Sequence, residues 1–170
     1  MTTLLKHLQH QVRARVLTGA GWLEGHFHLA QLHGLSQYLS RNAWYPLTEV
    51  VMEKVGALPF FQLSRAETVL VVIAPATRPP PSFSSGARPQ DARFVLTHNA
   101  VDGVVQLPTR LRLSDFMDNS TGFIHLQHTA VRVWAEANAH SFDDVLLNPQ
   151  RVVGVIETGQ PTQIAAAVAS

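Results

Sequence analysis

The chain contains one pattern of residues twice, and the two occurrences are separated by a constant 78 positions. Each occurrence begins at an arginine, continues through apolar residues that alternate with polar ones around a glycine, and reaches a serine that follows a leucine. The matched positions are Arg15 and Arg93, Gly25 and Gly103, and Ser36 and Ser114. A repeat of this kind predicts two structural modules of one design.

Each copy changes from strand-like to helix-like spacing. Alternation over 23–29 and 101–107 has the period of a half-buried strand, whereas Leu113, Phe116 and Met117 are spaced as on one face of a helix. Further strand patterns follow, and a shift in parity between Leu126 and Val131 predicts a bulge. We therefore expect a mainly β fold with short helices (α+β), in which two tandem pseudo-symmetric β-β-α-β-β-β modules pack together, each a small bent sheet or an SH3- or Sm-like barrel.

A stretch rich in proline and serine separates the two copies, and it predicts an extended connector over residues 75–91. The first module then covers residues 11–74, the second covers 92–157, and residues 158–170 form a flexible tail. A module of about 60 residues buries too little surface to be stable alone. We therefore expect the copies to pack about a pseudo-two-fold axis, as subunits do in a symmetric dimer.

The composition argues for a protein partner. Only 15% of the residues are charged, against roughly 25% in an average soluble protein, so part of the surface is weakly polar. The net charge of +1 gives no general attraction to nucleic acid or an anionic membrane, although Lys6, Arg13 and Arg15 leave a local nucleic-acid contact open as a third alternative. The chain has no cysteine, which excludes disulfides and thiolate chemistry. We see no signal peptide and expect a cytoplasmic protein.

The densest polar cluster surrounds the start of the second helix pattern. Arg110, Arg112, Ser114 and Asp115 could bind a small anionic ligand, because guanidinium groups and a helix N-terminus both attract phosphate or carboxylate. The structural alternative is that Ser114 caps the helix and Asp115 occupies its first turn. That capping role is the favoured interpretation, because the first copy keeps the serine and lacks both arginines.

A second cluster consists of histidines in the first copy. His26 and His28 share one side of a strand, and with His33 they predict a possible zinc, nickel or copper site. The structural alternative is a pair of half-exposed strand histidines.

The chain offers no recognisable catalytic motif. It contains neither a Gly-x-Ser-x-Gly elbow nor a phosphate-binding glycine-rich loop, and Asp143-Asp144 reads as an exposed turn. We therefore predict no catalytic residue and no cofactor, and we favour a protein that is not an enzyme.

The run Arg110-Leu-Arg-Leu-Ser-Asp-Phe-Met-Asp-Asn is similar to an R-L-S-D-[FY]-[LM]-[ND] element of uncharacterised bacterial proteins, in which it lies between strands. This resemblance implies a bacterial source and carries no activity. Asp118-Asn-Ser-Thr-Gly122, with the upstream arginines, also resembles the signature of PilZ domains, which bind cyclic di-GMP, but its spacing departs from that pattern by one residue.

These observations lead to one expected function and one alternative. We expect a non-enzymatic scaffold or adaptor that binds another protein or assembles with itself as a homo-oligomer, with exposed aromatic residues such as Trp44 and Trp134 contributing. The alternative is a protein that binds a small ligand, nucleotide or metal through the arginine or histidine cluster. We expect no membrane interaction, no nucleic-acid partner and no defined small molecule.

Overall fold

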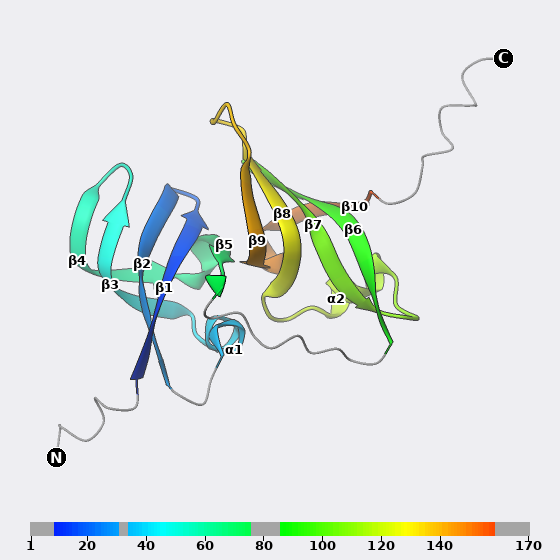
Figure 1. Ribbon diagram of the computed structural model, residues 1–170, viewed down its shortest axis with the longest axis horizontal. Coiled ribbons are helices and arrows are strands. Elements are labelled where there is room, and N and C mark those ends of the chain that lie inside the picture. Colours follow the sequence, from blue (N-terminus) through cyan, green and yellow to red (C-terminus); the bar gives the residue numbers. More distant parts are fainter. Residues whose placement is uncertain (1–8, 31–33, 76–85, 159–170) are drawn as a thin grey trace.

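A computed structural model describes residues 9–30, 34–75 and 86–158, and these residues form one open antiparallel sheet with two short helices (Figure 1). The first half contains β1 (Gln9–Thr18), β2 (Gly21–Ala30), α1 (Leu35–Arg41), β3 (Trp44–Met52), β4 (Gly56–Ser64), a 3-10 turn (Arg65–Glu67) and β5 (Thr68–Val72). The second half contains β6 (Ala87–Leu96), β7 (Asn99–Pro108), α2 (Leu113–Asn119), β8 (Ile124–Val133), β9 (His140–Leu147), a 3-10 turn (Pro149–Arg151) and β10 (Val152–Glu157). The predicted order β-β-α-β-β-β is therefore correct for both halves.

The ten strands lie in the order β10-β6-β7-β8-β9-β5-β1-β2-β3-β4. Within each half the fifth strand pairs with the first, and the first to fourth follow in sequence. The halves meet where β5 pairs with β9, which is the fourth strand of its half. A two-fold arrangement would have joined like strands, so the expected pseudo-two-fold contact was wrong.

A bulge bends the second and third strands of each half at the same place. The pairing shifts between Glu24 and His26 in β2 and between Asp102 and Val104 in β7, so a glycine sits at each bulge. On the opposing strands, Glu49 and His128 have positive φ values of 51° and 49°. The bulge predicted between Leu126 and Val131 is thus confirmed.

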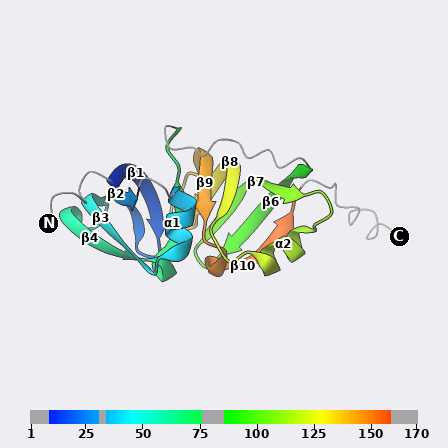
Figure 2. The same ribbon diagram turned by 90° about the horizontal axis from the view of Figure 1, so that it is seen from below.

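Glycine is needed at these bulges because the neighbouring strand comes very close. A Cβ added to Gly25 would lie 2.9 Å from Val50 Cγ2, and one added to Gly103 would lie 3.3 Å from Gln127 O. A larger residue at Gly25 would force the Val50 side chain to shift, and one at Gly103 would force the neighbouring atoms to give by a few tenths of an ångström. The two glycines therefore permit the sharp curl of each half around its own core (Figure 2).

Two hydrophobic clusters fill the molecule, and each includes residues from the other half. Phe123 and Leu146 of the second half join the first cluster, whereas Trp22 and Leu70 of the first half join the second. Leu70, Leu146 and Leu147 are at most 2% exposed, so the apolar interior continues across the β5–β9 contact. The halves form one body rather than two separate modules.

Polar bonds also hold the halves together at this junction. The buried Asn148 side chain donates to Arg65 O and Thr68 O, at 3.1 and 2.9 Å. Helix α1 lies near the centre of the molecule in Figure 2, and the Oγ of its Ser40 accepts from Phe123 N at 3.1 Å. Arg65 donates to Ser40 O and to Thr121 O, and so ties α1 to the second half.

Two expected boundaries differ from the structure. β6 begins at Ala87, so residues 87–91 belong to a strand, while residues 76–85 of the expected connector lie outside the described residues. β1 begins at Gln9, before the expected start at residue 11. Of the expected tail, only Thr158 is described, and its N–H donates to Asp91 O.

Two local interpretations were also wrong. Helix α2 begins at Leu113, with Arg112 at the N-cap and no side-chain cap, so Ser114 lies inside the helix; the equivalent serine, Ser36, lies inside α1. The helix starts earlier because Leu113 is buried and anchors its first turn. Asp115 does occupy the first turn, as expected.

Candidate interaction surface

The outermost strands of the sheet each have one unpaired side. Among the strands of residues 9–30, 34–75 and 86–158, β4 pairs with β3 alone and β10 pairs with β6 alone. We call these free sides the β4 edge and the β10 edge. A free edge presents unpaired N–H and C=O groups, which accept an additional strand.

Hydrogen-bonded pairs alternate along an antiparallel ladder, and this alternation identifies the backbone groups at each edge. Arg65 N donates to Ala43 O at 2.8 Å, which places Gln62 on the free side of β4. Thr158 N donates to Asp91 O at 3.1 Å, which places Val155 on the free side of β10. These residues therefore direct their N–H and C=O groups away from the sheet.

Large apolar side chains are exposed along both edges. On β10, Val153 is 72% exposed and Ile156 is 53% exposed. On β4, Phe60 is 58% exposed, and Trp44 at the start of the neighbouring strand β3 is 56% exposed. The predicted exposure of Trp44 is thus confirmed, as is that of Trp134. These exposed apolar side chains beside unpaired strands make the two edges candidate interaction surfaces.

A cleft of about 660 Å³ opens between the halves. The turns β1–β2, β3–β4, β6–β7 and β8–β9 line it, together with Arg151. Its charged lining residues are of both signs, namely Lys54, Arg151, Glu53 and Glu136, so the lining favours neither an anion nor a cation. None of the described residues that we predicted as ligands lines this cleft.

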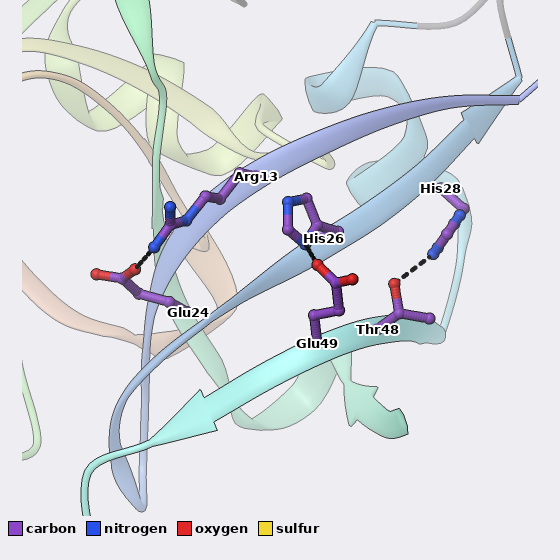
Figure 3. Close-up of polar contacts among 6 residues, drawn as sticks. All are labelled: Arg13, Glu24, His26, His28, Thr48 and Glu49. Atoms are coloured by element: carbon purple, nitrogen blue, oxygen red, sulfur yellow. Dashed lines mark hydrogen bonds and ion pairs between the residues drawn. The ribbon is translucent and has the colours of Figure 1, made fainter. Parts of the chain in front are cut away.

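The two described histidines of the predicted metal site lie on β2, and each has its own partner (Figure 3). His26 Nδ1 lies 3.3 Å from Glu49 Oε2, and His28 Nε2 forms a 2.9 Å hydrogen bond with Thr48 Oγ1. His33 lies outside the described residues. Across residues 9–30, 34–75 and 86–158, no group of three metal-binding side chains is present.

The second half contains a polar pair at the place of the His28–Thr48 pair. Gln106 Nε2 donates to Gln127 Oε1 at 3.1 Å, again between the second and third strands beyond the bulge. The Gln106–Gln127 pair thus makes the same kind of cross-strand contact in the second half as the His28–Thr48 pair makes in the first. His28 therefore has a structural role as a cross-strand contact.

The predicted arginine cluster is exposed. Arg110 follows β7, Arg112 precedes α2, and Ser114 and Asp115 lie in the first turn of that helix. In the described part of the chain, neither arginine side chain forms a hydrogen bond or an ion pair. These four residues are thus neighbours along the chain, and all four are exposed.

Two polar contacts were missed by the sequence interpretation. Asp143-Asp144 lies inside β9 rather than in a turn, and Asp144 is 2% exposed, with its Oδ1 2.8 Å from His125 Nε2. The Arg15 guanidinium stacks over the Trp22 ring at 4.4 Å. Both contacts join side chains of neighbouring strands, β1 with β2 and β8 with β9, and they depend on the register of these strands, which the spacing within one strand does not indicate.

Burial dominates the ionisation of the two tyrosines. Desolvation raises the pKa of Tyr45 well above its ordinary value, and the Tyr45 hydroxyl donates to Leu39 O at 2.6 Å. Burial also raises the pKa of Tyr38. Both groups are therefore neutral structural elements that hold α1 on the first core, and neither has the lowered pKa of a catalytic phenol.

The chain matches no protein-family model, and no curated protein and no solved structure is significantly similar to it. None of the helices in the described ranges is long and apolar enough to span a bilayer. The candidate site therefore follows from geometry alone.

Proposed function

We propose that this protein is a non-enzymatic scaffold that binds protein partners by adding strands to its sheet. The observation that carries the proposal is the pair of free edges, β4 and β10, flanked by exposed apolar side chains. Main-chain hydrogen bonds supply affinity in strand addition, and side chains next to the edge supply specificity. The proposal includes the cytoplasmic location and bacterial source expected from the sequence.

The proposal also includes an internal duplication, in which each half is a copy of one module of the SH3- or Sm-like kind. Three features support it: the same order of elements, the same order of strands, and a bulge at matching glycines. The pairing of β3 with β4 also matches that of β8 with β9, since Tyr45 faces Leu63 and Ile124 faces Leu147.

A strand peptide tests the function directly. A fluorescent peptide that copies residues 140–148, the segment of β9, should bind the β10 edge because β9 already binds a fifth strand within the chain. Binding should raise fluorescence polarisation and should be lost for a control peptide with Leu146→Pro, since proline removes an N–H from the centre of the new ladder. Equal signals from the two peptides would refute strand addition.

The alternative function is binding of a nucleotide, another small ligand or a metal. The exposed Arg110 and Arg112 beside α2 favour it, because guanidinium groups attract phosphate and carboxylate. A thermal-shift screen with nucleotides, cyclic di-GMP and divalent metals tests it. Stabilisation that is lost in Arg112→Ala or His26→Ala would support this alternative, and no stabilisation by any compound would refute it.

A further inference from the structure

The in-chain contact between β5 and β9 supplies a template for what the free edges bind. It joins the fifth strand of one half to the fourth strand of the other. Of the ten described strands, those without a second partner are β4, a fourth strand, and β10, a fifth strand. We propose that β4 of one molecule pairs antiparallel with β10 of a second copy, so that copies join head to tail. This inference rests on the proposed function and names its partner.

The in-chain register can be transferred to the contact between copies. Val71 faces Leu146 at the junction. Val71 and Val155 occupy equivalent positions, because Val71 faces Val16 and Val155 faces Phe94, the counterpart of Val16. Leu146 and Gln62 are equivalent as well, because Leu146 faces His125 and Gln62 faces Pro46, the counterpart of His125. The register therefore places Gln62 opposite Val155 of the second copy, with Leu63 opposite Gly154 and Phe61 opposite Ile156.

The backbone directions agree with this register. At the junction, Ile73 N donates to Asp144 O at 3.1 Å and Asn148 N donates to Val69 O at 2.9 Å. Alternation makes Val71 and Leu146 the hydrogen-bonded pair between these two bonds. Their counterparts, Val155 and Gln62, are the residues that direct their backbone groups away from the sheet.

Residues at the in-chain junction and their counterparts at the free edges differ in burial. Each residue at the in-chain junction is more buried than its counterpart at a free edge. The pairs are Phe123 (8% exposed) and Trp44 (56%), Leu146 (2%) and exposed Gln62, Val71 (0%) and half-buried Val155, and Leu39 (0%) and half-buried Met117. The exposed Trp44 thus corresponds to a residue that the other half covers, and α2 of a second copy would cover it in the same way.

The contact joins two different surfaces, so it leaves one free edge at each end of a growing assembly. Repetition gives a ring if the rotation closes and a filament if it does not. Gln62 stands where the junction has Leu146, and Glu157 stands where it has Ile73. These polar replacements make the contact between copies weaker than the junction, so assembly depends on concentration.

Sedimentation velocity of the full chain over a range of concentrations tests the proposal. The average mass of the wild type should rise beyond that of a dimer. Gln62→Pro and Val155→Pro each remove one N–H that faces away from the sheet, which an edge strand tolerates, and each variant alone should remain a monomer. A one-to-one mixture of the two should form dimers and nothing larger, because each variant keeps one intact edge.

Several results would overturn the proposal: a wild type that is monomeric at all concentrations, a proline variant that assembles like the wild type, or a mixture that remains monomeric. A variant independent of proline is Gln62→Leu, which restores the residue of the junction and should lower the concentration for half-assembly at least about threefold. Unchanged or weaker assembly of Gln62→Leu would also overturn it. A monomeric wild type that still binds the strand peptide would overturn this inference and leave the proposed function intact. A wild type that neither assembles nor binds the peptide would refute the proposed function as well.

Discussion

Leu146→Ala tests how tightly the two halves are joined. Leu146 belongs to β9 in the second half, yet it is 2% exposed and packs in the core of the first half. Replacement of a buried leucine by alanine costs about 2–5 kcal/mol, and the cost is higher where the surroundings cannot collapse. Val71, directly opposite on β5, is held by ladders on both sides, so we expect a loss of about 3 kcal/mol in the free energy of unfolding.

Urea denaturation followed by circular dichroism measures this loss, at a protein concentration low enough to keep the chain monomeric. In thermal denaturation, each kcal/mol shifts the Tm of a domain of this size by about 2–4 °C, so the Tm of the variant should fall by about 6–12 °C. The matched control is Gln62→Ala at the counterpart on the β4 edge, where the exposed side chain should matter by less than about 0.5 kcal/mol. Equal losses in the two variants would refute the argument that Leu146 joins the halves.

Two further predictions concern the bulges and the tyrosines. Gly25→Ala should destabilise the fold by about 1–3 kcal/mol, because its Cβ would lie 2.9 Å from Val50 Cγ2. The control Gly154→Ala has no atom within 4 Å of its Cβ and should be neutral in the same urea assay. Equal effects of the two variants would contradict the close approach at Gly25. Since burial raises the pKa of Tyr38 and Tyr45 above the ordinary 10.0, the folded state holds the phenol protons more tightly than the unfolded state. The contribution of these groups to the free energy of unfolding should therefore be constant below pH 10.0 and fall above it. An ultraviolet titration in which the folded protein forms phenolate at pH 10.0 would contradict this.

The local part of the fold could be predicted because it depends on short-range patterns. Alternation around Gly25 and Gly103 identified the strands, and the spacing of Leu113, Phe116 and Met117 identified the second helix. The bulge near His128 was also visible, since an extra residue in one strand shifts the parity of every later side chain.

The arrangement of the halves could not be predicted in the same way. The junction pairs Leu70 with Leu147, and no periodicity specifies a partner at that separation. The assumption of two-fold symmetry favoured contact between like strands, whereas the chain joins unlike ones. The role of Asp144 was missed for the same reason, because its partner His125 lies on another strand.

The candidate surface was only partly accessible from the sequence. Trp44 was identified as an exposed aromatic residue, but a free edge is a property of the whole sheet and cannot be assigned before the strand order is known. The histidine and arginine clusters attracted attention because of their composition. In the structure, His28 forms a cross-strand contact, while Arg110 and Arg112 lie in open solvent.

Cysteine cross-linking tests the central claim, that the β4 edge binds the β10 edge of a second copy, most directly. The chain has no cysteine, so Gln62→Cys and Val155→Cys introduce the only thiols. In a hydrogen-bonded antiparallel pair the Cα atoms lie about 5.5 Å apart, which a disulfide can bridge. On mild oxidation, a mixture of the two variants should give a reducible covalent dimer several-fold faster than Gln62→Cys mixed with Val51→Cys, whose exposed side chain lies on β3. Equal rates in the two mixtures, or no covalent dimer, would contradict the claim.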